Sequence, residues 1–367
     1  MLEGTPLSFT PIIMTKNKQA CILLLNDIHV SKDNIPEYLA NWHEALEVCV
    51  THGVREIAFG GDMFQSRSSQ TLDVLLAVHD ALLEAEHSGI RVILANGNHD
   101  KVNQENLRGY CHVFDRHANV TMADAFYTVT GEEWDFALHI GAYFPEDGTF
   151  TERLDEWHAT GTVDGKLNYL YIHEGINGAL GQPNEKELPA KAFKGFDRVF
   201  VGHYHNRTQV KPNIEYIGSS RQMNFGEDEE KGYTLIYTDG STEFIKNNVN
   251  VRYQVIDVDA GRVNAHLNDR LEEIRGDGRY RTKVRIHGTS AETSNINKEQ
   301  LLQSGANKVE IVNEETVPTE GEAGGLFEKF DSRKIQESYR HFCEEKEIED
   351  VELGLNYLSK IEESCGD

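Results

Sequence analysis

The stretch Val92-Ile93-Leu94-Ala95-Asn96-Gly97-Asn98-His99-Asp100 changes abruptly from apolar residues to a glycine, an amide, an imidazole and a carboxylate. Four apolar residues bounded by Asn and Gly are typical of a strand that is buried on both faces. Open α/β sheets place their chemistry just beyond the carboxyl ends of such strands. The stretch therefore predicts a buried strand that ends in a functional site.

Two earlier stretches have the same design. The run Cys21–Leu25 is followed by Asn26-Asp27-Ile28-His29, and the run Glu56–Phe59 is followed by Gly60-Gly61-Asp62. The polar endings recur about every 36 residues, which is the length of one strand, helix and strand unit. We therefore expect three neighbouring strands to deliver ligand-type side chains to one edge of a sheet.

Apolar residues at helical spacing fill the segments between these strands. They span residues 38–50, with Gly53 placed to end the helix, and residues 69–88, with Gly89 in the same role. The predicted buried stripe of the second helix comprises Leu72, Leu75, Leu76, His79, Leu82 and Leu83. The β-α-β-α-β order predicts a parallel sheet with right-handed crossovers.

Further apolar runs predict strands later in the chain, at residues 134–140, 167–172, 198–201 and 233–237. The second of these runs is followed by His173-Glu174-Gly175, and the third by Gly202-His203-Tyr204-His205. We expect this group to form a second half of the same sheet and to bring its histidines to the same edge.

The predicted domain order follows from changes in pattern along the chain. Residues 1–19 are expected to be a leader, residues 20–250 the main domain, and residues 251–313 a small α/β module. Residues 314–325 are acidic and lack periodicity, which is typical of a linker. The apolar stripes of residues 326–367 predict a helical tail that docks on a partner or, alternatively, packs on the chain's own domains.

Composition limits the environment and the classes of partner. The 367-residue chain has a formal net charge of −25, which opposes nonspecific binding to nucleic acid and anionic membranes. It contains no apolar run of about 18 residues and no basic segment followed by an apolar one at its start, so neither a membrane span nor a signal peptide is expected. The five cysteines are scattered without a CxxC pair, which predicts a reducing, cytoplasmic location.

The polar residues at the predicted strand ends are all oxygen or nitrogen donors: Asp27, His29, Asp62, Asn98, His173, His203 and His205. Imidazole together with carboxylate suits Mn, Fe or Zn. Seven donors exceed the needs of one ion, so we expect two divalent ions about 3.5–4 Å apart, bridged by Asp62. Manganese is the expected metal, with Fe, Zn or Mg as alternatives.

Such a pair of ions clamps the attacking and leaving oxygens of an in-line displacement at phosphorus, and water is the nucleophile. His99 is the predicted catalytic residue, which stabilises the transition state or protonates the leaving oxygen. Asp100 is expected to orient a neighbouring imidazole. The histidines outside these motifs, including His139, are assigned to helix faces or loops. Each motif alone is weak, whereas five of them in order at predicted strand ends support a metal centre.

Five motifs follow one another along the chain: Asp27-x-His29, Gly61-Asp62, Gly97-Asn98-His99-Asp100, His173 and Gly202-His203-x-His205. Together they resemble the signature of calcineurin-like metallophosphoesterases, over roughly residues 20–245. The resemblance implies an α/β fold in which a two-sheet sandwich is flanked by helices. It also implies His99 as the catalytic histidine and two metal sites that share a ligand, one formed by Asp27, His29, Asp62 and His205, the other by Asp62, Asn98, His173 and His203.

The segment from Tyr216 to Glu227, followed by Lys231-Gly232-Tyr233, resembles the SbcD-type DNA double-strand-break repair nucleases. That resemblance implies a small α/β capping domain, a C-terminal helical element that docks on an SbcC-type coiled-coil ATPase, and a homodimer. Gln65 is a departure, because archaeal and eukaryotic relatives carry a second active-site histidine there.

Basic residues alternate with other residues in the predicted strand at 280–286. Arg279, Arg281, Lys283, Arg285 and His287 would share one face of that strand. The face could contact DNA phosphates, or its charges could discourage edge pairing of an exposed strand. Arg67 and Arg221 are further candidates for contact with substrate phosphates, against the alternative that they are solvated. The acidic run 227–230 is expected to be a solvated turn.

The sequence thus predicts a di-metal DNA nuclease that hydrolyses phosphodiester bonds at DNA ends and works with an ATPase partner. A metallophosphatase or nucleotide phosphodiesterase that acts on a small or protein-bound phosphate is the first alternative, and the net acidity favours it. A scaffold protein with a purely structural metal is the second alternative, which the complete donor set together with His99 disfavours.

Overall fold

The computed structural model describes residues 18–145, 149–182, 184–314, 343 and 351. The predicted leader, linker and helical tail therefore lie outside the described residues, apart from Lys18, Gln19, Glu314, Cys343 and Val351. The described part divides into two compact units, one of residues 18–258, 262–285 and 297–310, the other of residues 259–261, 286–296 and 311–314. Within it, no helix combines the length and the apolar composition needed to cross a membrane.

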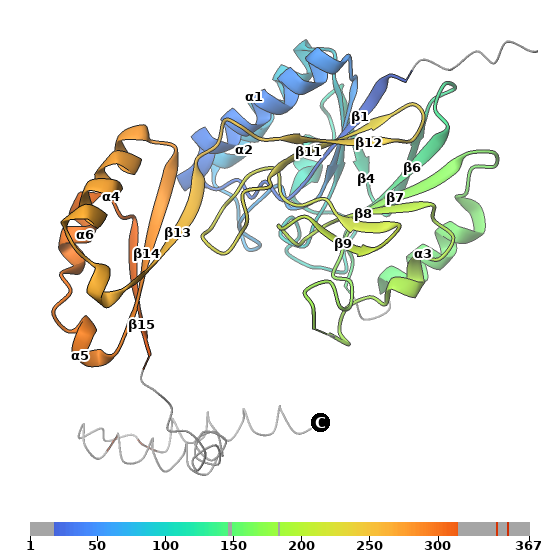
Figure 1. The fold of residues 1–367 in the computed structure, drawn as a ribbon. Helices are drawn as coiled ribbons and strands as arrows, with labels where there is room; N and C mark the ends of the chain where they lie inside the picture. Colours follow the sequence, from blue (N-terminus) through green and yellow to red (C-terminus); the bar gives the residue numbers. More distant parts are fainter. Residues whose placement is uncertain (1–17, 146–148, 183, 315–342, 344–350, 352–367) are drawn as a thin grey trace, which may run out of the picture. The chain divides into compact units, whose positions relative to one another are not determined.

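The first sheet has six strands in the order β12-β11-β1-β2-β3-β4 (Figure 1). These are β1 (Ala20–Leu25), β2 (Glu56–Gly60), β3 (Arg91–Ala95), β4 (Val120–Ala123), β11 (Gly232–Tyr237) and β12 (Thr242–Lys246). Strands β1, β2 and β3 are parallel, as predicted, and β4 is parallel to β3. Strand β11 runs antiparallel to β1, and β12 runs antiparallel to β11. The sheet is therefore mixed, because the late strand β11 covers the edge of β1.

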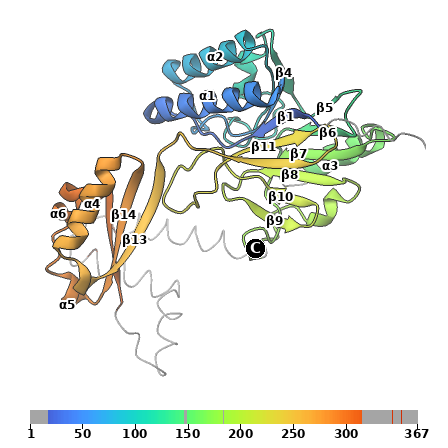
Figure 2. The ribbon, with the colours of Figure 1, turned by 45° about the horizontal axis from the view of Figure 1, so that its top comes forward.

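Helices α1 (Ile35–His52) and α2 (Leu72–His87) pack on one face of this sheet (Figure 2). Helix α1 ends at Gly53, as predicted, in the left-handed conformation with φ 70°. Trp42 of α1 is fully buried, and its indole N–H donates to the carbonyl oxygen of Ala81 in α2, 2.8 Å away. This contact ties the two helices to each other.

The stripe predicted for α2 is right at Leu82, which is buried, and wrong at Leu72 and Leu76. Leu72 and Leu76 are 68% and 48% exposed, and the buried residues are Val74, Ala77, Val78, Ala81, Leu82 and Ala85. Small alanines on the inner face let the helix lie close to α1 and the sheet, while Leu72 and Leu76 remain outside. The prediction counted leucines and left out Val74 and the alanines, so it assigned the exposed Leu72 and Leu76 to the buried stripe.

The strand predicted at residues 233–237 joins the first sheet as β11. The strands predicted at 134–140, 167–172 and 198–201 belong to a separate six-stranded sheet, so the prediction of a second half of the same sheet is wrong for these three. Its order is β5-β6-β7-β8-β10-β9. The strands are β5 (Phe126–Thr130), β6 (Phe136–Gly141), β7 (Leu167–His173), β8 (Arg198–Gly202), β9 (Thr208–Lys211) and β10 (Ile214–Tyr216). Strands β6, β7, β8 and β10 are parallel, and β5 and β9 are antiparallel edge strands. The apolar runs required a second layer because both faces of β6, β7 and β8 are buried.

The two sheets pack face to face. One core lies between them and includes Leu24 and Ile93 of the first sheet with Leu138, Tyr171 and Phe200 of the second. On the outer face of the second sheet, helix α3 (Thr149–Thr160) packs residues such as Trp157 onto the sheet. The two-sheet sandwich flanked by helices is therefore confirmed (Figure 2).

A third, three-stranded sheet follows in the order β13-β14-β15, formed by Arg252–Asp259, Tyr280–Gly288 and Lys308–Asn313. Helices α4 (Ala265–Asp277), α5 (Ser290–Thr293) and α6 (Lys298–Ser304) connect these strands. Helix α4 starts where the Asn264 side chain accepts hydrogen bonds from two backbone N–H groups, and it ends at Gly278 with φ 69°. The strand predicted at residues 280–286 corresponds to β14.

His139 is a fully buried residue of β6 rather than a residue of a helix face or loop. Its Nε2–H donates to Asn168 Oδ1 at 3.0 Å, and its Nδ1 accepts from the Thr128 hydroxyl at 2.8 Å. Both ring nitrogens are thus satisfied by the neutral imidazole. Burial lowers the pKa of His139 to about 4.

We expect this buried histidine to weaken the fold in acid. Its pKa is below the value of 6.5 of the unfolded chain, so the unfolded state binds more protons, and stability is lost as the pH falls from 6.5 towards 4. Between pH 7 and pH 5 the free energy of unfolding should fall by about 2 kcal/mol more in the wild type than in His139→Gln. Denaturant unfolding at both pH values measures this difference. His87→Gln, at the exposed end of α2, should show the same fall in the free energy of unfolding as the wild type. If the fall in His139→Gln equals that of the wild type, buried His139 is not the cause of the acid sensitivity.

Candidate metal centre

The predicted donor residues lie where strands β1, β2, β3, β7 and β8 end, at one edge of the sandwich. The loops after β1 and β2 are joined by backbone hydrogen bonds, from Asp27 N to Gly61 O at 3.0 Å and from His29 N to Asp62 O at 3.1 Å. Among the described residues, the left-handed region of φ is occupied by four non-glycine residues: Asp27, His29, Asp62 and His203. This conformation costs free energy for residues with a Cβ, and strain of this kind is typical of functional sites.

Gly97 allows the loop after β3 to approach the loop after β2. A Cβ atom at this position would overlap the carboxylate and the backbone nitrogen of Asp62. The glycine is therefore what brings Asn98 and His99 next to Asp62. His99 N donates to Asp62 Oδ1 at 2.8 Å, which fixes that carboxylate.

Asp27 is fully buried, and its two carboxylate oxygens have different surroundings. Oδ2 accepts hydrogen bonds from the Asn26 amide and from the backbone N–H of His203. Oδ1 has no hydrogen-bond partner and lies 3.8 Å from Nε2 of each of three imidazoles, those of His29, His173 and His205. An unpaired buried carboxylate oxygen that faces three imidazole nitrogens is what a cation ligand requires.

Asp62 lies between the two groups of donors. Its Oδ2 is 3.5 Å from His29 Nε2 and 3.2 Å from His173 Nε2. These histidines come from opposite sheets, since His29 follows β1 and His173 ends β7. Asp62 Oδ2 is therefore placed to serve both metal positions, as the prediction of a bridging ligand requires.

Asn98 presents its amide oxygen to acceptor atoms. The oxygen is 3.3 Å from each of Asp62 Oδ2, His173 Nε2 and His203 Nδ1, while the amide nitrogen faces the Arg67 guanidinium. Two side-chain oxygens, those of Asn98 and Asp62, repel each other at this distance unless a cation lies between them, so this orientation suits a metal ligand. His29 Nε2 and His205 Nε2 also face each other, at 3.2 Å, which suits two ligands of one metal ion.

The second nitrogen of two of these imidazoles is held by an acceptor. His173 Nδ1–H donates to the carbonyl oxygen of Gly60 at 2.9 Å, and His205 Nδ1–H donates to Glu227 Oε1 at 2.8 Å. Each bond directs the Nε2 lone pair towards the centre of the site. The arrangement brings all seven predicted ligands together, and the donor set fits two divalent ions.

The electrostatics of the site also favour cation binding. Burial raises the pKa of Asp62, but the neighbouring imidazoles, His173 foremost, more than compensate and bring it to about 2. Burial likewise opposes ionisation of Asp27, and the same imidazoles hold its pKa well below its usual range. Burial lowers the pKa of His173, and the two carboxylates together raise it to about 10. Two ionised carboxylates buried side by side require positive charge, which a divalent cation can supply.

Asp100 does not orient an imidazole, so that prediction is wrong. Its fully buried carboxylate accepts from the backbone N–H groups of Gly97, Phe64 and Met63 at 2.8, 3.0 and 3.3 Å. Burial, together with the charge of Asp62, raises its pKa to about 7. Asp100 therefore ties together the loops after β2 and β3.

His99 faces a pocket of about 350 Å³ that the metal donors also line. Its Nδ1–H donates to the backbone carbonyl oxygen of Gln65 at 2.7 Å, so Nε2 is the nitrogen available to a bound molecule. Gln65 lines the same pocket. Burial lowers the pKa of His99, so the imidazole is neutral near pH 7.

The two arginines proposed to contact substrate have different environments. Arg67 is exposed and lines the pocket beside Asn98. Arg221 is only 4% exposed, and its guanidinium donates to the backbone carbonyl oxygens of Ile28 and His29. Arg221 thus supports the loop that carries His29 and does not reach the pocket, contrary to the prediction.

The basic residues of β14 do lie on one face, but most of them are paired with carboxylates. Arg281 pairs with Glu37 at 3.0 Å, Lys283 with Glu310 at 2.8 Å, and Arg285 with Asp257 at 3.4 Å. Arg279 is exposed. The strand is central in its sheet, so the alternative of an exposed edge strand is also wrong. Paired charges offer less attraction to phosphates than a free basic stripe would.

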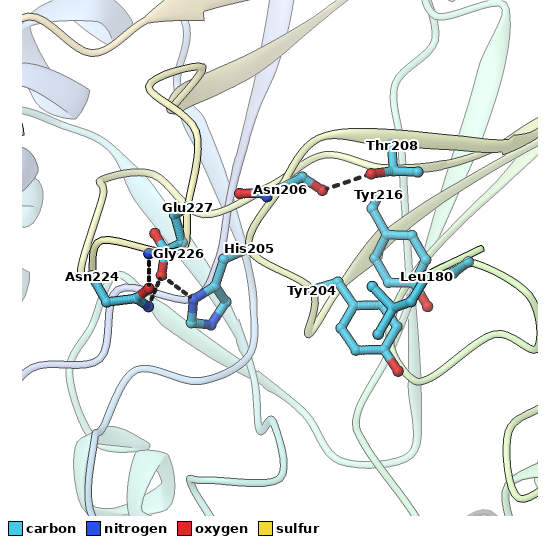
Figure 3. Close-up of a pocket in the computed structure, with 10 residues that line it drawn as sticks. Leu180, Tyr204, His205, Asn206, Thr208, Tyr216, Asn224, Gly226 and Glu227 are labelled. Carbon is cyan, nitrogen blue, oxygen red and sulfur yellow. Dashed lines mark hydrogen bonds and ion pairs between the residues drawn. The ribbon is translucent and has the colours of Figure 1, made fainter. Parts of the chain in front are cut away.

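Glu227 is a functional residue that the sequence prediction missed. Instead of lying in a solvated turn, its side chain is 6% exposed and holds His205 (Figure 3). Lys231, fully buried, lies 3.7 Å from the same carboxylate, and its ammonium group also donates to the His205 carbonyl oxygen. The spacing of four residues between Glu227 and Lys231 was the only available signal, and it is common on protein surfaces.

Removal of this carboxylate should weaken metal binding without unfolding the protein. We expect Glu227→Ala to reduce affinity for Mn²⁺ by about 10–100-fold at the weaker site, because His205 loses the acceptor that orients it. Glu227→Gln keeps an acceptor oxygen, so its affinity for Mn²⁺ should fall less than that of Glu227→Ala. Calorimetric titration of the metal-depleted variants with Mn²⁺ measures both affinities, and Asp228→Asn serves as the control. Unchanged affinity in Glu227→Ala would show that His205 does not depend on this contact.

Comparison with known proteins supports the same conclusion as the geometry. A family model described as Calcineurin-like phosphoesterase matches residues 21–207. A protein named as a phosphoesterase, 244L of Invertebrate iridescent virus 6, is 26% identical over 222 residues, 59% of this chain and 75% of that protein. The SbcD component of the nuclease SbcCD from Staphylococcus saprophyticus is 26% identical over 206 residues, 49% of this chain and 54% of its own length.

The chain thus spans about half the length of that nuclease component. Among solved structures, a dimetal phosphatase from Danio rerio shares 9% identity, with 59% of this chain and 91% of that chain covered and a TM-score of 0.41. The family model covers just over half of the chain, including all seven donors and His99. The protein therefore belongs to the calcineurin-like phosphoesterase family, whose members are hydrolases of phosphoesters.

Proposed function

We propose that this protein is a nuclease that uses two divalent metal ions, Mn²⁺ in the first instance, to hydrolyse phosphodiester bonds at DNA ends during repair or recombination. The observation that carries the hydrolytic part of this proposal is the placement of His99 Nε2 in the pocket that the metal donors line. A purely structural metal would need neither an accessible pocket nor a histidine that faces it.

The side chains have distinct tasks in this reaction. Two bound divalent ions supply a water-derived nucleophile at neutral pH and compensate negative charge on the phosphate oxygens. Arg67, at the exposed margin of the pocket, can pair with a further phosphate oxygen. His99, held through Nδ1 by the Gln65 carbonyl, can carry a proton on Nε2 once an anionic phosphate raises its basicity. It then gives that proton to the leaving oxygen.

DNA as the substrate is supported by the likeness to a component of an SbcCD nuclease and by the small α/β module after residue 251. We further propose that this module, residues 251–313, is a capping domain of the catalytic domain at residues 20–250. The same likeness supports an SbcC-type coiled-coil ATPase as the partner, docked on residues 326–367, and a homodimer. Catalysis on DNA would then depend on local positive groups such as Arg67, since the net charge is −25.

A nucleotide phosphodiesterase or metallophosphatase is the second candidate. The acidic net charge and the carboxylate partners of the β14 basic residues favour it, because both weaken attraction to a polyanion. A small substrate could bind in the pocket that His99 lines, without contacts to a basic surface elsewhere.

One experiment separates these candidates. Metal-depleted protein with added Mn²⁺ is incubated with an end-labelled DNA duplex and, separately, with a small aryl phosphodiester. The nuclease proposal expects shortening of the duplex, and His203→Ala, which removes a metal ligand, should abolish it. Hydrolysis of the aryl ester without any cleavage of the duplex, repeated in the presence of an SbcC-type ATPase, would overturn the DNA proposal and favour the second candidate.

A further inference from the structure

A second pocket, of about 250 Å³, adjoins the metal centre (Figure 3). It shares His205 and Asn224 with the pocket that His99 lines together with His29, Asp62, Asn98 and His203. A molecule whose phosphate is bound by the metal centre can therefore extend past His205 into this second space. Ligand pockets usually measure about 300–1,000 Å³, so the space suits one ring system rather than a whole ligand.

Tyr204, which is partly exposed, supplies the aromatic surface of this pocket, and the fully buried Tyr216 supports it from behind. The Tyr204 ring lies 5.0 Å from the Tyr216 ring and 4.9 Å from the His203 ring, between centroids. Tyr204 donates its hydroxyl to Glu187, and the Tyr216 hydroxyl donates to the carbonyl oxygen of Glu174 at 2.9 Å. Because both hydroxyl groups are bound, the rings are held in position.

The rest of the lining combines an apolar wall with amide groups. Leu180, which is 68% exposed, stands beside the tyrosines (Figure 3). The Asn206 side-chain oxygen accepts from Lys231 at 2.9 Å and from the backbone N–H of Asp228 at 3.2 Å, so its NH₂ group is the part that can bond to a ligand. A flat ring with acceptor atoms at its edge matches this combination of an aromatic face, an apolar wall and a peripheral donor.

We propose that this Tyr204 pocket binds a nucleobase of the substrate, the one attached to the nucleotide whose phosphate lies at the metal centre. The inference rests on the proposed function for its ligand class, and it adds a subsite that reads the base by stacking. Stacking accepts any base, because every base has a π-face. The pocket should thus favour nucleotides over sugar phosphates without strong sequence preference.

Binding of small probes tests the subsite without any need for turnover. The Mn²⁺-loaded protein is titrated calorimetrically with 2′-deoxyadenosine 5′-monophosphate and with 2-deoxyribose 5-phosphate, which share the phosphate and the sugar. We expect the nucleotide to bind about tenfold more tightly, which corresponds to about 1.4 kcal/mol. Tyr204→Leu, which keeps an apolar side chain, should reduce the ratio of the two dissociation constants towards one, and Tyr204→Phe should preserve it.

Three results would overturn the proposal. The first is equal affinity for both probes in the wild type, and the second is a ratio that Tyr204→Leu leaves unchanged. The third is phenyl phosphate binding as tightly as the nucleotide with the same dependence on Tyr204, which would assign the pocket to simple aromatic groups. Failure of the nuclease proposal has a different signature, since nucleotides would still bind through Tyr204 while the DNA duplex remained uncleaved.

Discussion

Asp62→Asn is expected to abolish phosphodiester hydrolysis, with a loss of at least about 10³-fold in kcat, and to remove tight binding of two metal ions. The carboxylate oxygen Oδ2 lies 3.5 Å from His29 Nε2 and 3.2 Å from His173 Nε2, so it is positioned between both groups of donors. An amide at this position is neutral and binds hard cations less strongly than a carboxylate.

Metal stoichiometry provides the decisive measurement for Asp62. Titration of metal-depleted protein with Mn²⁺ should show two sites in the wild type and at most one in Asp62→Asn. Asp164→Asn, an exposed aspartate far along the chain, should retain two sites and full activity. A variant Asp62→Asn that still binds two ions with wild-type affinity would rule out the bridging role and the di-metal assignment that depends on it.

The sequence was sufficient for the elements whose signals are local. The endings at Asp27, Asp62 and Asn98 follow apolar runs that could only be buried strands, and Gly53 ends α1 as expected. The seven donors converge because they all occur at carboxyl ends of strands, a rule that holds even though the strands belong to two different sheets. The position of the donors at the carboxyl ends of strands predicts the edge at which the site lies. It does not predict whether the strands form one sheet or two.

Features that depend on contacts distant in sequence could not be predicted. Glu227 reads as part of an acidic run, and only the folded chain places it against His205. Arg221 reads as an exposed arginine, but the loop of Ile28 and His29 uses its guanidinium to satisfy backbone carbonyl groups. In α2, hydrophobicity alone assigned Leu72 and Leu76 to the buried stripe, whereas close packing buries the alanines and Val74 in their place. In each case the partner is far along the chain, where periodicity carries no information.

His99→Ala is expected to reduce kcat for DNA by about 10²–10⁴-fold while both metal ions remain bound. His99 is close enough to His29 and Asp62 to be a metal ligand by distance alone. However, its Nδ1–H is committed to the Gln65 carbonyl, and seven other residues already supply the donors. Titration of His99→Ala with Mn²⁺ should therefore show two sites, whereas loss of one would make His99 a ligand.

The leaving group distinguishes proton donation from simple charge stabilisation at His99. A nucleoside alkoxide needs a proton as it departs, whereas nitrophenolate is a stable anion and does not. In His99→Ala, kcat should accordingly fall less than about tenfold for a nitrophenyl ester of a nucleotide and at least about a hundredfold for DNA. His43→Ala, on the exposed face of α1, should be unaffected with either substrate. Equal losses on the two substrates would assign His99 to stabilisation of the phosphoryl charge, because protonation of the leaving oxygen cannot matter equally for both.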